Sequence, residues 1–294
     1  MRVKFRPIMV AVVVALPGCS VKEAPKEAAT DSSTATQTTT PATAPKVVNI
    51  TATEYKFDAP ESIPAGLTTF RLTDSGKEMH HATLIKLDSG KTLADFQAGM
   101  KMMKPGTPPP SWVVPAGGPN AVAPGSTSEI TVSLEPGNYA LVCFIPDGKG
   151  VPHVAHGMMK GLTVTAGAAP SVAEPAADVS VTLKDYQFDF STPLTAGKHT
   201  LKIETAPGQP HEFTLFQLAP GKTTADLMKY VETGMKGPPP AMPLGGVAGV
   251  SAGRASYYTV DLKPGEYAIV CFLEDSKDGK PHFMHGMVQQ IKIS

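Results

Sequence analysis

One cysteine, two histidines and one methionine recur in the same order in two separate parts of the 294-residue chain. The first set is His80, Cys143, His153 and Met158, and the second set is His211, Cys271, His282 and Met287. A thiolate, two imidazoles and a thioether together suit a soft or borderline transition metal. We therefore predict one mononuclear metal site for each set.

The spacing of these residues predicts how each set comes together. The cysteine and the second histidine are 10 residues apart in the first set and 11 in the second, and that histidine precedes the methionine by 5 in both. Three of the four side chains thus belong to one loop, and the first histidine opens a strand that must lie beside that loop. His80 is chosen over His81 because aligning ATL with FTL pairs His80 with His211 and leaves Glu212 opposite His81.

An internal repeat positions the two sets. EYKFDAPESIPAG at residues 54–66 matches DYQFDFSTPLTAG at residues 185–197, and LEPGNYALVCF at 134–144 matches LKPGEYAIVCF at 262–272. The offset is 131 at the first match and 128 at the second, so small changes in loop length explain the drift. The chain therefore contains a duplicated domain of about 110 residues, which is far longer than a solenoid repeat.

Short runs of alternating apolar and polar residues fill each repeat, for example TTFRL, EITVSL and YALVCF. They are rich in β-branched and aromatic residues and are separated by Pro/Gly turns, a pattern typical of strands in a two-layer antiparallel sandwich. We expect one helix in each repeat, at residues 91–103 and 223–235, because the Pro-rich segments GTPPPSW and GPPPAMP would end a helix there. The predicted fold class is all-β.

The ligand order and the strand pattern resemble the cupredoxin family, and the resemblance covers about 230 of the 294 residues. Two histidines and a cysteine with a weak axial methionine is the ligand set of blue-copper electron-transfer sites. The resemblance implies two tandem Greek-key sandwiches at residues 47–165 and 179–294, joined by a linker at 166–178. It also implies copper, one or two type 1-like ions per chain, held by the eight residues named above. In this family the loop histidine, here His153 or His282, is where electrons enter from a partner.

The His-to-Met segments HVAHGM and HFMHGM look most like the type 1 site of copper nitrite reductases. In those enzymes and in multicopper oxidases, histidines beside the site cysteine carry electrons to a catalytic copper centre. Val142, Phe144, Val270 and Phe272 occupy these positions here. We therefore expect that the chain is not an enzyme and that it has no catalytic residues.

The first residues have the pattern of an export signal. A basic start and the apolar run 8–16 precede Leu-Pro-Gly-Cys at residues 16–19, which resembles the lipobox of bacterial lipoproteins. This implies a signal peptide at 1–18, lipidation of Cys19 and a Ser/Thr/Ala/Pro-rich tether at 19–46. We expect a protein anchored by lipid in the bacterial cell envelope, facing the periplasm or the exterior.

The charge balance excludes one class of partner and leaves another open. Lys and Arg total 26, as do Asp and Glu, so the chain lacks the basic excess with which proteins bind nucleic acid. The expected partner is a redox or copper-handling protein of the cell envelope. Two alternatives to electron transfer remain at this point: a storage or delivery module for Cu(I), and a metal-free cupredoxin-like interaction domain.

Structural roles also remain open for several of these residues. Cys143 and Cys271 could be inert buried side chains or could form a disulfide between the repeats. His156 and His285 each lie two residues before a predicted methionine ligand, and this position favours a role in orienting the loop over a role as a ligand. Tyr139 and Tyr267 are expected to fill the core. Five methionines lie around the helix ends and the Pro-rich segments, and we favour a packing role for them over a surface that binds Cu(I): Met100, Met102, Met103, Met235 and Met242.

Overall fold

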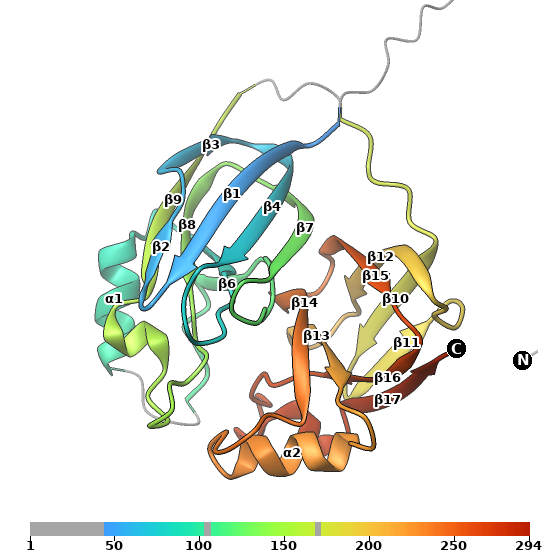
Figure 1. Ribbon diagram of the computed structural model, residues 1–294. Helices are drawn as coiled ribbons and strands as arrows, with labels where there is room; N and C mark the ends of the chain where they lie inside the picture. The colour runs from blue at the N-terminus through green and yellow to red at the C-terminus, as the bar shows by residue number, and fades with distance from the viewer. Residues whose placement is uncertain (1–43, 103–106, 168–171) are drawn as a thin grey trace, which may run out of the picture. The chain divides into compact units, whose positions relative to one another are not determined.

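The computed structural model describes residues 44–102, 107–167 and 172–294, and these described residues all belong to the same structural unit (Figure 1). The expected signal peptide, Cys19 and most of the expected tether lie outside the described residues. Within the described residues no helix is both long and apolar enough to cross a membrane. We call residues 44–167 the first repeat and residues 172–294 the second repeat.

Each repeat consists of short strands with one α-helix and one turn of 3-10 helix. The first repeat contains β1 (Lys46–Thr53), β2 (Lys56–Asp58), β3 (Ser62–Pro64), β4 (Gly66–Asp74), β5 (Thr83–Leu87), α1 (Leu93–Met102), β6 (Val113–Pro115), β7 (Thr127–Leu134), β8 (Gly137–Val142), η1 (His153–His156) and β9 (Met159–Thr165). The second contains β10 (Val179–Lys184), β11 (Gln187–Phe190), β12 (Gly197–Thr205), β13 (His211–Leu218), α2 (Thr224–Glu232), β14 (Ala241–Val250), β15 (Ala255–Leu262), β16 (Gly265–Val270), η2 (His282–His285) and β17 (Val288–Ile293).

The all-β sandwich fold is confirmed. In the first repeat, the layer β2-β1-β4-β7 packs on the five-stranded sheet β3-β9-β8-β5-β6, and in the second, β11-β10-β12-β15 packs on β14-β13-β16-β17. Alternate residues of each strand point inward, so Phe70 and Leu72 of β4 and Leu141 of β8 are fully buried in one core cluster. The sandwiches place β8 and β16, which lead to the two cysteines, in the middle of their sheets.

Most strand pairs are antiparallel, but the first strand of each repeat runs parallel to its neighbour. β1 pairs with β4, and β10 pairs with β12, in this way. In the first repeat, β3 lies in the opposite sheet beside β9 before the chain returns to β4. This crossover is what lets two strands of one sheet run in the same direction.

The two repeats share one continuous eight-stranded sheet, because β7 pairs antiparallel with β15. Ile130 lies opposite Tyr258, and the two residues are 128 positions apart, as are Cys143 and Cys271. A second contact joins residues 116–122 to β14. There Pro119 lies opposite Val247, again 128 positions along the chain.

The helices form where the sequence predicts them. Thr223 caps α2 in a capping box with Asp226, and Leu227 packs the helix onto Phe216 of the sheet. In the first repeat, Met100 packs with Phe96 and other apolar side chains under α1. Met100 therefore has the packing role expected of it, whereas Met102 is 82% exposed and Met103 lies outside the described residues.

Candidate metal centres

The ends of two neighbouring strands and one loop position each set of predicted ligands. Cys143 follows β8, His153 begins η1 and Met158 follows η1, while His80 precedes β5, the neighbour of β8. The loop is closed by hydrogen bonds from the Cys143 amide to the Met158 carbonyl at 3.2 Å and from the Met158 amide to the His153 carbonyl at 3.0 Å. The four residues are therefore held by backbone structure.

The second repeat builds the same frame although its loop is one residue longer. The Cys271 amide donates to the Met287 carbonyl at 3.1 Å, and the Met287 amide donates to the His282 carbonyl at 3.0 Å. His211 is the first residue of β13, the neighbour of β16. The additional residue lies in the 274–281 part of the loop and leaves the hydrogen bonds around the site unchanged.

The predicted donor atoms of the first set converge. The Nδ1 atoms of His80 and His153 are 3.1 Å apart, and Cys143 Sγ lies 3.4 Å from His153 Nδ1 and 4.0 Å from His80 Nδ1. All three side chains are fully buried, and so is Met158. One ion between these atoms would contact a sulfur and two nitrogens at once.

The second set has nearly the same geometry. His211 Nδ1 and His282 Nδ1 are 3.1 Å apart, and Cys271 Sγ is 3.3 Å from His282 Nδ1. Met287 is fully buried beside them. The structure thus brings together the histidines and cysteine of each predicted set, with the methionine next to the cysteine through the backbone.

The hydrogen bonds on the outer side of the imidazoles fit metal binding. His153 Nε2 is 3.0 Å from Glu78 Oε2, and His211 Nε2 is 3.0 Å from Asp185 Oδ1. A neutral imidazole that donates from Nε2 to a carboxylate presents an unprotonated Nδ1 on its other side. That lone pair faces the cysteine sulfur and the second imidazole, where a cation would satisfy all three donors. The residues present therefore fit a soft or borderline metal ion.

Each centre has one histidine with a carboxylate partner and one without, but the pattern is reversed between repeats. His80 Nε2 and His282 Nε2 are buried with no hydrogen-bond partner among the described residues. The closest carboxylate oxygens, of Glu54 and Asp275, are 3.9 Å away. A carboxylate on the far nitrogen makes an imidazole a stronger donor. The strand histidine is thus strengthened in the second centre and the loop histidine in the first.

Burial also determines the protonation of the metal-free centres. It lowers the pKa of His80 and of His282 to about 4, in each case with a further contribution from the neighbouring histidine. It raises the pKa of the Cys143 thiol to about 12, although the backbone groups of His81 and Ile145 act to lower that pKa. It likewise raises the pKa of Cys271. At neutral pH these imidazoles are uncharged and the thiols are protonated, so each bound metal ion must displace a thiol proton.

Cys143 and Cys271 are both free, which rules out the disulfide between the repeats. We predict that iodoacetamide at pH 8 leaves both thiols of the folded, metal-free chain unlabelled, because they are buried and protonated. In urea, both should be labelled, as read from peptide masses. The protonated form of Cys143 also supports the fold: that contribution is complete below a pH of about 9, the unfolded value, and is lost as the pH rises towards about 12. Fast labelling of either thiol without urea would contradict this burial.

Two tyrosines that the sequence analysis did not single out cover the loop histidines. The Tyr55 ring lies 5.0 Å from the His153 ring and stacks on His156 at 4.3 Å. Tyr186 lies 5.7 Å from His282 and 5.0 Å from His285. His153 and His282, the expected entry points for electrons from a partner, are 0% exposed and lie beneath these tyrosines. The sequence does carry a signal for these two tyrosines, because an acidic residue followed by tyrosine begins both matched segments, 54–66 and 185–197.

His156 and His285 orient the loops, as favoured from the sequence. His156 Nε2 is 3.0 Å from Asp147 Oδ2, and His285 Nε2 is 3.1 Å from Asp278 Oδ1. Asp278, His285 and Asp275 also form a third cluster close enough to hold an ion. However, the Asp275 carboxylate already accepts hydrogen bonds from Tyr186 and Gln209 and from the Lys277 amide. Loop structure accounts for this cluster.

No protein-family model and no curated protein matches the chain. Among solved structures, a reduced auracyanin from Roseiflexus castenholzii is 19% identical over 42% of this chain and 99% of its own, with a TM-score of 0.27. A multicopper oxidase is 12% identical over 84% and 88%, with a TM-score of 0.25. A copper-containing nitrite reductase from Thermus scotoductus is 9% identical over 84% and 61%, with a TM-score of 0.24. Likenesses this distant carry no argument about function.

The expectation that the chain is not an enzyme is corrected here: the solved structures that the chain is similar to include two that are enzymes by name. That expectation rested on Val142, Phe144, Val270 and Phe272 beside the cysteines. Their apolar side chains remove one route by which electrons leave the cysteine. They do not decide whether electrons reach a reacting group by another route, so the inference from these four positions was too strong.

Proposed function

We propose that the chain binds copper at one or both His/Cys/Met centres and transfers single electrons in the bacterial cell envelope. The observation that carries this proposal is the convergence of two Nδ1 atoms and one Sγ in each repeat, all buried. Copper bound there would alternate between Cu(I) and Cu(II). The residues His80, Cys143, His153 and Met158, and their counterparts in the second repeat, would hold it as type 1-like ligands.

The frame around each centre supports electron transfer because it constrains the ligands before any metal arrives. Backbone hydrogen bonds fix the cysteine, the loop histidine and the methionine, and carboxylates fix one imidazole in each centre. A ligand set held in one geometry changes little between the two oxidation states. The lipid anchor at Cys19 and a redox or copper-handling partner remain part of the proposal.

The test is to load the purified chain with Cu(II), remove excess metal and measure copper content and visible absorption. We expect an intense thiolate-to-copper band and up to two coppers per chain. Cys143→Ser and Cys271→Ser should each remove one copper and its share of the band, because serine keeps the size but not the thiolate. Asn138→Ala, which removes a side-chain bond to Lys91 away from both centres, is the control. A chain that retains neither Cu(II) nor Cu(I) would refute the proposal.

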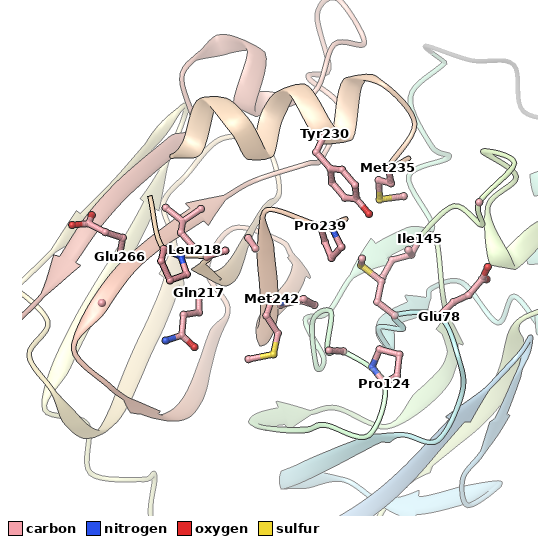
Figure 2. Close-up of a pocket in the computed structure, with 18 of the residues that line it drawn as sticks. Glu78, Pro124, Ile145, Gln217, Leu218, Tyr230, Met235, Pro239, Met242 and Glu266 are labelled. Carbon is pink, nitrogen blue, oxygen red and sulfur yellow. The ribbon is translucent and has the colours of Figure 1, made fainter. Parts of the chain in front are cut away.

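A groove next to the first centre favours a second candidate function, the storage or delivery of Cu(I). It has a volume of about 980 Å³ and contains Met79, Met235 and Met242 in its lining. Figure 2 labels Met235 and Met242. The groove also contains Glu78, the hydrogen-bond partner of His153. Thioethers bind Cu(I) well, so methionines beside the centre could retain additional Cu(I).

The methionines of the groove can be tested apart from the two centres. Replacing Met79, Met235 and Met242 together by leucine conserves volume. If they hold copper, the variant should retain less Cu(I) per chain while the absorption of the two centres stays unchanged. Met102→Leu, on the exposed end of α1, is the matched control. Equal Cu(I) retention in all three proteins would leave electron transfer as the better-supported function.

A further inference from the structure

A chain of buried polar groups runs between the two candidate centres. At its middle lies Asn120, on the segment between β6 and β7, with 2% of its surface exposed. Its Nδ2 donates to Thr214 Oγ1 at 2.7 Å and to the Val247 carbonyl at 3.1 Å, and lies 3.4 Å from Glu212 Oε2. All three partners belong to the second repeat, so Asn120 reaches across from the first.

On the second-repeat side, Glu212 connects Asn120 to the cysteine of the second centre. Its Oε1 accepts the Phe272 amide at 2.8 Å, and its own amide donates to Cys271 Sγ at 3.4 Å. Glu212 follows the predicted ligand His211 directly in the sequence. Glu212, which contacts Asn120 through its side chain, is therefore hydrogen-bonded through its backbone amide to the cysteine sulfur of the second centre.

On the first-repeat side, His81 makes the equivalent connections. Its Nε2 accepts the Phe144 amide at 2.7 Å, and the next residue, Ala82, donates its amide to the carbonyl of Pro119, the residue before Asn120, at 2.9 Å. Phe144 directly follows Cys143 in the sequence. His81, Asn120 and Glu212, with the backbone between His81 and Asn120, thus link the residue next to Cys143 to the sulfur of Cys271.

This linkage is costly to the fold, and other contacts already join the repeats. Burial lowers the pKa of His81 to about 4 and raises that of Glu212 to about 7, so both side chains are disfavoured as ions in this core. Apolar side chains of similar size would avoid such desolvation. The β7–β15 pairing holds the repeats together without them. Moreover, the position equivalent to Asn120, 128 residues on, is Ala248, so the repeat does not require the amide.

We propose that His81, Asn120 and Glu212 form a path for electron transfer between the two copper centres, an inference that rests on the proposed copper function. One electron leaves the reduced centre and reduces the oxidised one. No bond forms or breaks, and no other reactant is needed. The opposite placement of the carboxylate partners makes the centres unequal, which gives the exchange a favoured direction.

The first experiment measures electron exchange in the copper-loaded full chain carrying Met287→Gln. Changing the axial ligand shifts the spectrum and potential of the second centre, so the two can be followed separately. A pulse of a small one-electron reductant supplies less than one electron per chain. We expect a later phase in which one centre gains the electron that the other loses, at a rate independent of protein concentration. Two copper bands without such a phase would overturn the path and leave the proposed function standing.

Variants then test whether the phase depends on the bridge. Asn120→Ala should lose the electron-exchange phase while both copper bands remain. Asn120→Leu, whose side chain fills the space of the amide, should also lose the phase and keep both bands. Arg254→Ala is the matched control, because the Arg254–Glu135 ion pair at 3.6 Å also joins the repeats but lies outside the bridge. An unchanged rate in both Asn120 variants, or equal slowing in Arg254→Ala, would overturn the proposal.

A metal-free measurement provides an independent readout. The Phe144 amide donates a hydrogen bond to His81, and the Phe272 amide donates one to Glu212. Hydrogen exchange of these two amides should be faster in metal-free Asn120→Ala than in the metal-free unaltered chain. Arg254→Ala should leave both amides as slow as before. Unchanged exchange at both amides in Asn120→Ala would show that Asn120 does not support the bridge, which would also overturn the proposal.

Discussion

Gly246→Ala should destabilise the chain by about 3 kcal/mol or more, because no space exists for the added methyl group. Gly246 lies in β14 with φ of +124°, and a Cβ there would lie 1.9 Å from the Phe213 carbonyl oxygen of the adjacent strand. That atom belongs to the backbone of β13, whose first residue is the predicted ligand His211. Relief of the clash requires β13 and β14 to separate.

The control for this substitution is Gly253→Ala. Gly253 also has a positive φ, +75°, but a Cβ there meets nothing within 4 Å, so only backbone strain of about 1 kcal/mol is expected. Urea unfolding of the two variants and the unaltered chain gives the comparison. Similar midpoints for the two variants would show that β14 tolerates the methyl group and that the clash is relieved at little cost.

Tyr267→Ala should cost about 3–5 kcal/mol of stability, the range typical of removing a large buried aromatic side chain. Tyr267 is 1% exposed and belongs to the main core cluster. Its hydroxyl donates to the Lys263 carbonyl at 2.8 Å and accepts the Lys263 amide at 3.0 Å, closing the turn that starts β16. Because β16 leads to Cys271, we also expect weaker retention of copper at the second centre.

Tyr267→Phe separates the ring from the hydroxyl. It keeps the packing but leaves both backbone groups of Lys263 without this partner, at an expected cost of about 1–3 kcal/mol. Urea unfolding of the two variants provides the measurement, and copper content at the second centre provides the functional readout. If the alanine variant were no less stable than the phenylalanine variant, the ring would contribute nothing and the expected core role of Tyr267 would be wrong.

The grouping of the candidate ligands was predictable because most of it is local. Cys143, His153 and Met158 lie within one loop, and the repeat supplied a second example of the same order. Aligning that repeat also separated His80 from His81, whose ring turns out to bond to the Phe144 amide instead of joining the centre. The strands were predictable for the same reason, since alternation and Pro/Gly turns are local signals.

The surroundings of the centres were not predictable in this way. Tyr55 reaches His153 only because the turn after β1 folds over a loop about 100 residues further along the chain. The carboxylates come from unequal positions: Glu78 aligns with Gln209, so comparing the repeats could not reveal its role. The pairing of β7 with β15 was hidden as well, because alternation identifies a strand without identifying its neighbour.

The register between the repeats has a consequence for how the chain arose. Ile130 faces its own counterpart Tyr258, Pro119 faces its counterpart Val247, and the pairs on either side are equivalent by exchange of the repeats. This is the isologous contact of a twofold-symmetric homodimer. Duplication and fusion of the gene for such a dimer account for both the repeat and the contact. Because both halves belong to one chain, aligned positions of the two repeats can differ, as the unequal pairs His81/Glu212 and Asn120/Ala248 do.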